Sequence, residues 1–173
     1  MSGQLTIVFK RFCFQILLLS VALYSPASLG QEEARAGLVV VTRGQVTAVD
    51  SSGASRALRR GAELHVGDTV VTQASSFAQV RMDDDAIISV QELTQFEILA
   101  YTFEGNPDSD VSTMRLIEGG LRTITGGIGQ ANRDAYSIET EFATIGIRGT
   151  DHELVITDAL YAGVYDGGTA MTN

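Results

Sequence analysis

The residues best suited to chemistry lie in one stretch near the C-terminal end of the chain. Its residues are Thr144, Ile145, Gly146, Ile147, Arg148, Gly149, Thr150 and Asp151. The single arginine offers a fork of N–H donors that could recognise an anionic ligand. It can equally serve the fold, because a charge buried without a partner is very costly. We favour the structural role for Arg148, with Glu139, Glu141 or Asp151 as its acid partner.

Side-chain alternation around this stretch predicts two short strands that meet at a corner. The apolar residues from Tyr136 to Phe142 share one parity, whereas Ile145 and Ile147 have the other. The alternation therefore slips at Ala143-Thr144, which is typical of a bulge or corner. We interpret the whole stretch as a motif that defines the fold, and not as an active site.

Histidines and carboxylates offer little for a metal site. His65 and His152 are far apart in the sequence, and neither has a second ligand at the usual spacing. Asp83-Asp-Asp85 would hold calcium only if other carboxylates converged on it. A solvated acidic turn is the favoured interpretation for residues 83–85, and Asp151 before His152 is expected to cap a strand end. We expect no metal and no cofactor.

Nucleotide binding and nucleophilic catalysis also lack their usual context. Gly126-Gly-Ile-Gly-Gln-Ala131 is rich in glycine, but no Lys-Ser/Thr pair or helical pattern follows it, so we expect a loop. No Gly-x-Ser-x-Gly motif occurs, and residues 31–173 contain neither cysteine nor lysine. A catalytic pair of carboxylates for glycoside hydrolysis stays an open alternative, since two acids distant in sequence can lie together in the fold. We expect that the protein is not an enzyme.

Short β-strands must position these residues. Runs rich in Val, Ile and Thr recur at intervals of roughly eight to twelve residues, separated by turns that contain Gly or Asp. The pattern predicts a single all-β domain, either a β-roll or solenoid or a sandwich. Thr113–Ile117 and Leu121–Ile124 are expected as two strands around Gly119-Gly120. Asp166-Gly-Gly168 is expected as a hairpin turn.

The first thirty residues have the pattern of a secretory signal peptide. Lys10 and Arg11 precede an apolar run from Phe12 to Leu23, and small residues end at Gly30. That run is short for a membrane span, which needs about 20 residues. We leave open whether the sequence is truncated at its C-terminus. The expected organisation is a signal peptide over 1–30, a flexible N-terminus over 31–37 and an all-β domain over 38–173.

The charge balance excludes one class of partner. Two of the 12 basic residues lie in the expected signal peptide, whereas all 21 acidic residues follow it, so residues 31–173 carry a net charge of −11. A nucleic-acid binder needs a basic surface, so we expect no nucleic acid. We expect an acidic domain in the periplasm or outside the cell, with no stable membrane insertion after signal cleavage.

Several stretches resemble the FecR domain, a periplasmic bacterial module, in the order of that family. They are Gly44-Gln-Val46, Leu58–Gly61, Leu64-His-Val-Gly-Asp-Thr-Val70, Ala78–Met82, Gly119–Gly129, Thr144–Thr150 and Val164-Tyr-Asp-Gly167. The element Thr144-Ile-Gly-Ile-Arg-Gly-Thr150 is the most characteristic of them. The resemblance covers most of Leu38 to Met171. It implies a periplasmic all-β domain used in sensing and scaffolding, best known from regulators of iron-citrate uptake.

Those regulators carry a cytoplasmic part, one membrane span and a periplasmic part that contacts an outer-membrane transporter. This sequence opens with the expected signal peptide and therefore resembles the stand-alone exported type. The family pattern names no catalytic residues.

We expect a non-catalytic binding or scaffold module with an envelope protein as partner, linked by the resemblance to envelope signalling. One alternative is a polysaccharide- or cell-wall-binding module, in which tyrosines stack on sugar rings. The candidate tyrosines are Tyr101, Tyr136, Tyr161 and Tyr165. A weaker alternative is an envelope hydrolase that uses two carboxylates.

Overall fold

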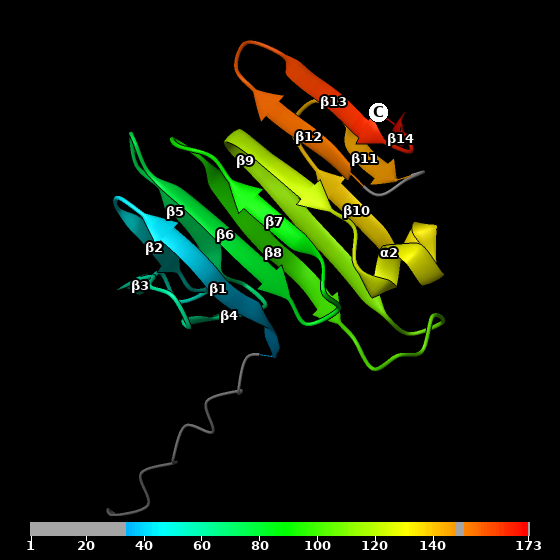
Figure 1. The fold of residues 1–173 in the computed structure, drawn as a ribbon, viewed down its shortest axis with the longest axis horizontal. Helices are drawn as coiled ribbons and strands as arrows, with labels where there is room; N and C mark the ends of the chain where they lie inside the picture. Colours follow the sequence, from blue (N-terminus) through cyan, green and yellow to red (C-terminus); the bar gives the residue numbers. More distant parts are fainter. Residues whose placement is uncertain (1–33, 148–150, 173) are drawn as a thin grey trace, which may run out of the picture. The chain divides into compact units, whose positions relative to one another are not determined.

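The computed structural model describes residues 34–147 and 151–172, which are mostly β-structure (Figure 1). The strands are β1 (Arg35–Arg43), β2 (Val46–Val49), β3 (Ser55–Ala57), β4 (Glu63–His65), β5 (Thr69–Thr72), β6 (Phe77–Met82), β7 (Ile87–Val90), β8 (Gln95–Thr102), β9 (Val111–Ile124), β10 (Tyr136–Glu139), β11 (Thr144–Ile147), β12 (Asp151–Ile156), β13 (Leu160–Asp166) and β14 (Thr169–Thr172). The expected all-β class is confirmed.

The loop expected after Gly126 is partly helical. It contains one short helix, α2 (Gly127–Ala131), and a 3₁₀ turn, η1 (Arg133–Ala135). No helix among the described residues is long and apolar enough to cross a membrane.

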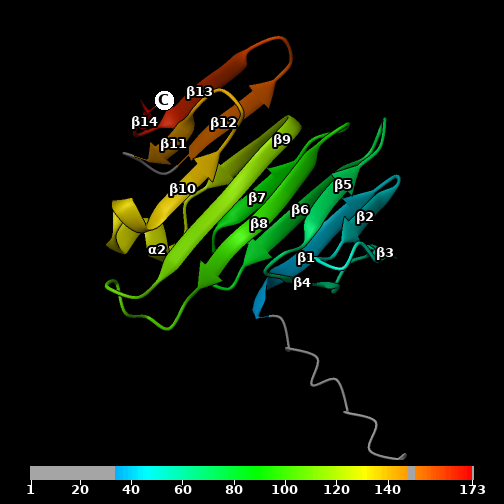
Figure 2. The same ribbon diagram turned by 180° about the vertical axis from the view of Figure 1, so that it is seen from behind.

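Strand β9 belongs to two sheets. Its first half, up to Glu118, pairs antiparallel with β8 and parallel with β10. Its second half, from Gly119, pairs antiparallel with β7 and β12. One sheet therefore has the order β4-β1-β6-β7-β9-β12-β13, and the other has the order β3-β2-β5-β8-β9-β10-β11-β14. Figures 1 and 2 show β9 as one long strand with β7 and β8 on one side and β10 and β12 on the other.

Glycine in the middle of β9 allows this change of sheet. Leu116 in the first half and Leu121 in the second both face the core, so the side-chain alternation shifts by one residue between them. Gly119 has a φ of 80°, a conformation that residues with a Cβ rarely adopt. The expectation of two strands around Gly119-Gly120 was wrong, because one strand of 14 residues continues through the glycines.

The hydrophobic core takes side chains from both sheets. The sequence of β6 alternates so that Ala78, Val80 and Met82 share one face, and the structure buries this face and leaves the residues between them on the outer face. Burying each large aliphatic or aromatic side chain contributes about 1.5–3 kcal/mol, so the shared core holds the two sheets together. Its fully buried members include Leu64, Ile88 and Leu121 from one sheet, and Phe96, Ile98, Met114, Ile138 and Ile145 from the other.

The stretch before the motif folds as a hairpin, so the predicted corner at Ala143-Thr144 was wrong. Strands β10 and β11 pair antiparallel, with Ile138 opposite Ile145. Residues 140–143 form the turn, in which the Thr140 hydroxyl accepts hydrogen bonds from the N–H groups of Phe142 and Ala143. A hydroxyl that binds nearby backbone favours a turn, and this turn accounts for the change of parity.

The domain begins before the expected boundary at Leu38. Ala36 is fully buried, and Gly37 pairs with Met82 of β6. Arg35 makes two hydrogen bonds of 3.0 Å to Asp83. Residues 35–37, which were expected to be flexible, therefore belong to β1, whereas the expected signal peptide lies outside the described residues.

The turn at Asp166-Gly-Gly168 does not close a hairpin. Strand β13 pairs with β12 in one sheet, and β14 pairs with β11 in the other. Gly167 has a φ of 83°, which permits a sharp corner between the sheets. The local signal for a turn was right, but the pairing expected from it was wrong.

Replacing Gly119 by alanine should destabilise the domain more than the same change at Gly53. Both glycines have positive φ, which costs alanine about 1–2 kcal/mol. A Cβ on Gly119 would also lie 2.4 Å from the Leu93 carbonyl oxygen, whereas Gly53 has nothing within 4 Å. We expect Gly119→Ala to cost about 1–3 kcal/mol more than Gly53→Ala in urea unfolding. Equal losses would show that the close contact in β9 is unimportant.

Candidate functional site

The structure separates the two ends of the predicted motif. Ile145 and Ile147 of β11 are buried in the core, with Thr144 and Gly146 on the other face of the strand. Asp151 starts β12, which belongs to the other sheet. The remaining motif residues, Arg148, Gly149 and Thr150, lie outside the described residues.

Two of the three acids proposed as partners for Arg148 hold other arginines. Glu139 accepts a hydrogen bond of 2.8 Å from Arg115. Asp151 accepts two hydrogen bonds from Arg122, at 2.9 and 2.6 Å. This forked pair lowers the pKa of Asp151 and keeps it ionised.

The forked pair is part of a polar network on the outer face of β9, β12 and β13. The Arg122 guanidinium lies 4.2 Å from the ring centroid of Tyr165. The Tyr165 hydroxyl donates a hydrogen bond of 2.9 Å to Glu153, and this bond raises the pKa of Tyr165. Gln91 donates to the other oxygen of Glu153. The network holds the Tyr165 ring against the sheet while 59% of the residue stays exposed.

Strand β13 leaves one side of its sheet open; we call residues 160–166 the β13 edge. Among the described residues β13 pairs only with β12. Residues 161–166 are all exposed, including Tyr161 at 56% and Val164 at 44%. Val164 lies opposite His152, whose side chain is buried in the core. The side of β13 that continues the core-facing surface is therefore uncovered, as is its outer side.

Only half of the tyrosines considered for sugar stacking are available. Tyr101 and Tyr136 are buried, with 4% and 3% exposed, so that role was wrong for them. Tyr161 lies opposite Val155, and Tyr165 contacts Glu153. Both exposed rings are therefore on the outer face of the β13 edge.

A hollow of about 540 Å³ adjoins the β13 edge at the point where β9 changes sheets. We call it the glycine hollow, because Gly119 and Gly120 form part of its wall. Val155 also lines it and pairs with Tyr161, so the hollow and the β13 edge are continuous. Leu93 and Ile117 add exposed apolar surface to the hollow. Its other lining residues are Gln91, Glu92, Glu118, Glu141, Ile156 and Thr157.

The glycine hollow does bring together carboxylates that are distant in sequence. Glu92, Glu118 and Glu141 are all exposed. Glu92 accepts a hydrogen bond from the backbone N–H of Ser75, and Glu118 accepts one from Gln95. A carboxyl group that acts as a general acid is typically held in a desolvated setting. The three glutamates are thus better suited to binding a positively charged group than to acid catalysis.

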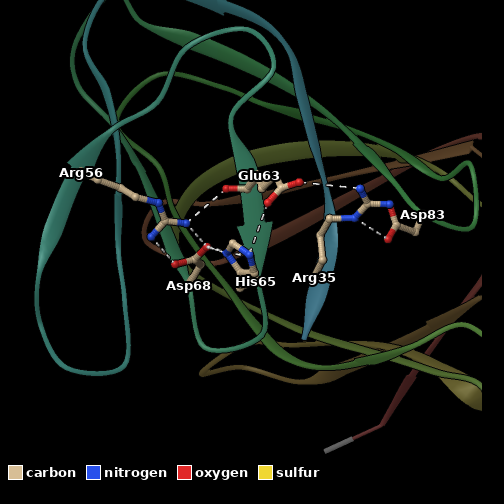
Figure 3. A network of polar contacts seen from close by, with 6 residues as sticks. All are labelled: Arg35, Arg56, Glu63, His65, Asp68 and Asp83. Carbon is tan, nitrogen blue, oxygen red and sulfur yellow. Dashed lines mark hydrogen bonds and ion pairs between the residues drawn. The ribbon is translucent and has the colours of Figure 1, made fainter. Parts of the chain in front are cut away.

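His65 belongs to a structural network (Figure 3). Asp68 is fully buried, and both of its carboxylate oxygens accept hydrogen bonds from Arg56. The backbone N–H of His65 donates to the same carboxylate at 2.8 Å. Breaking such a pair strands a buried charge, so it holds the β4–β5 turn in place. Figure 3 shows Glu63 between this pair and the Arg35–Asp83 pair.

The acidic turn at Asp83–Asp85 is not a simple solvated turn, contrary to expectation. Asp84 is only 5% exposed and accepts hydrogen bonds from the Tyr101 hydroxyl and the backbone N–H of Ile128. It therefore ties α2 to β8. No group of three His, Cys, Asp or Glu side chains in the described ranges is placed to hold a metal.

His152 is buried in the core. It is 1% exposed, and its ring lies edge-on to Tyr136 with 6.0 Å between centroids. Neither ring nitrogen has a hydrogen-bond partner among the described residues, and the same holds for the hydroxyls of Tyr136 and Thr123. Burial lowers the pKa of His152, although nearby Asp151 opposes the shift. The imidazole is therefore held neutral.

Comparison with known proteins identifies the family. The family model described as FecR protein matches residues 68–168, which is more than half of the chain. The chain belongs to the FecR family. FecR proteins are associated with envelope signalling, and the matched residues include the β13 edge and most of the glycine hollow. No curated protein and no solved structure matches the chain.

Part of this FecR surface could be anticipated from the sequence. The run Tyr161-Ala-Gly-Val-Tyr165 lacks the polar alternate residues of a half-solvated strand, and that signal was available. The hollow depends on β9 joining two sheets, which no local pattern indicates.

Folding stability should fall as the pH drops below about 6.5, the ordinary pKa of histidine. The folded state lowers the pKa of His152, so the unfolded chain binds the proton first and protonation favours unfolding. The stability that neutral His152 contributes is fully present above the pKa that this residue has in the unfolded chain. It is lost as the pH falls through the lower pKa that the residue has in the folded protein. We expect His152→Phe to flatten the melting temperature between pH 7 and pH 5, with His65→Gln as the control. If the melting temperature of His152→Phe fell between pH 7 and pH 5 as steeply as that of the wild type, His152 would not be the group responsible.

Proposed function

We propose that this FecR-family chain is an exported, non-catalytic module that binds a protein partner in the bacterial envelope. The observation that carries the proposal is the β13 edge, a strand that is paired on one side among the described residues and exposes apolar side chains on both faces.

Natural proteins usually protect the edges of their sheets. Short edge strands, charged side chains and covering loops prevent unwanted pairing. Strand β3, at the edge of the other sheet, follows this rule, since it has three residues with Arg56 in the middle. Strand β13 has seven residues and presents Tyr161, Val164 and Tyr165 to solvent. Contiguous exposed apolar surface of this kind is typical of an interaction site.

The location of the partner follows from separate observations. Residues 1–30 have the pattern of a secretory signal peptide, which directs the domain to the periplasm or beyond. The FecR family is associated with envelope signalling, which works through protein contacts. These observations support an envelope protein as the partner, with the module acting by binding.

Recognition of a cell-wall or extracellular polysaccharide is the second candidate. Tyr161 and Tyr165 lie on the same outer face, where rings can stack on sugars. Arg122 already covers part of the Tyr165 ring, and the network around Glu153 leaves fewer polar groups for sugar hydroxyls. The inner side of β13, with Ala162 and Val164 exposed, has no role in this candidate. Protein binding uses both sides of the strand.

Capture of an envelope partner should depend on the β13 edge. The full chain, carrying an affinity tag, would be expressed in a Gram-negative host and cross-linked before purification from the envelope fraction. We expect one specific protein to be recovered with the wild type and with Val41→Ala/Phe103→Ala, and to fall about tenfold with Tyr161→Ala/Val164→Ala, because the second pair removes interface surface. The two pairs are similar in exposure, at 44% and 42% against 56% and 44%. Equal recovery, or binding to a glycan array with no protein recovered, would contradict the proposal.

A further inference from the structure

We infer that the β13 edge binds by strand addition, taking an extended partner segment in which alternating apolar residues are flanked by lysine or arginine. This inference rests on the proposed function and names its mode of contact and the chemistry of the occupant. Three features of the β13 edge carry it.

The first feature is the backbone of β13. In an antiparallel sheet an edge strand is paired on one side and presents unpaired N–H and C=O groups on the other. Strand β13 is paired with β12 from Leu160 to Asp166, and no described strand lies on its far side. An added strand would find a template of seven residues, with a bulge at Tyr165 that leaves residues 160–164 as its regular part. Main-chain hydrogen bonds then supply affinity, and side-chain pockets supply specificity.

The second feature is the side chains on the two faces of β13. Tyr161 faces outward, opposite Val155, and Val164 faces the core side, opposite His152. The core-facing residues of β12 are buried, whereas Ala162 and Val164 are exposed. The apolar surface that β12 contributes to the core therefore continues onto β13, where none of the described residues covers it. A partner strand with alternating apolar residues would extend the sheet and place all of these residues on this side, where they shield the surface.

The third feature is charge. From residue 134 to the end, the sequence has seven acidic residues and one basic residue, Arg148. Beside the β13 edge, Asp158 accepts hydrogen bonds from the side chains of Thr157 and Tyr161. Glu153 accepts hydrogen bonds from Gln91 and Tyr165, and its charge also acts on the nearby Arg122. Basic residues at the ends of an added strand would lie near these carboxylates. They would also lie near the glutamates of the glycine hollow.

The glycine hollow also favours a basic side chain, at one end of the β13 edge. Its glutamates lie beyond Tyr161, next to the exposed side chains of Leu93 and Ile117. A long basic side chain could lay its methylene groups along the apolar wall and place its charge among the carboxylates. A second copy of this chain is a poor occupant, because it would bring the same acidic residues against themselves, with a net charge of −11 over residues 31–173 of each copy.

The test uses a labelled peptide, acetyl-KKTVTVTVKK-amide, and a counterpart with glutamate in place of every lysine. We expect the lysine peptide to bind the full chain, to be weakened by salt and to slow amide hydrogen exchange in residues 160–166. The glutamate peptide should not bind. Val164→Lys should weaken binding about tenfold or more, because an edge lysine blocks pairing and repels the peptide.

Val41→Lys is the matched control, since Val41 and Val164 are both 44% exposed and the added charge is the same. At Val41, β1 pairs with β6 in a part of its sheet that has no role in the β13 edge, so this variant should bind like the wild type. Equal melting temperatures of the two variants would show that neither change disturbs the fold. Equal peptide binding by the two variants would overturn the inference.

Other outcomes separate this inference from the proposed function. If an envelope protein is still captured through Tyr161 and Val164 but the lysine peptide fails to bind, strand addition is wrong and the proposed function stands. If both peptides bind equally, the basic occupant is wrong. A dimer of the full chain in light scattering that Val164→Lys abolishes would identify a second copy as the occupant and overturn the inference.

Discussion

The structure depends on one strand supplying backbone hydrogen bonds to two sheets. Buried N–H and C=O groups must be paired, and β9 meets this demand by serving β8 and β10 with one half and β7 and β12 with the other. Gly119 makes the change possible, because it accepts a positive φ and leaves room for Leu93 and Thr94. The two sheets are thereby fixed to each other by the chain itself and by the core that they share.

This arrangement also determines what the surface offers. Because β12 pairs with the second half of β9, the outermost strand of that sheet, β13, extends past the shared core and keeps its apolar side chains exposed. The glycines of β9 leave a hollow beside it, lined by glutamates. The polar network of Arg122, Asp151 and Glu153 anchors Tyr165 on the outer face. An acidic apolar edge of this kind favours binding over catalysis.

Local chemistry was predictable from the sequence, and long-range pairing was not. Alternation correctly placed Ala78, Val80 and Met82 on one face of a strand, and turn residues correctly marked Asp166-Gly-Gly168. The partners of β13 and β14 were mispredicted because a turn signal cannot say which sheet receives the next strand. Two ion pairs that no local pattern indicated illustrate the same limit, since Arg115 and Arg122 reach Glu139 and Asp151 from distant β9.

The central claim, that the β13 edge is the surface by which this FecR-family module meets its partner, is tested most directly by photocross-linking in living cells. A photoreactive benzoyl-phenylalanine would replace Val164 in one strain and Val41, which is equally exposed, in another. The account predicts a cross-link to an envelope protein from position 164 and none from position 41. Cross-links from position 41 alone, or from both positions to the same extent, would contradict it.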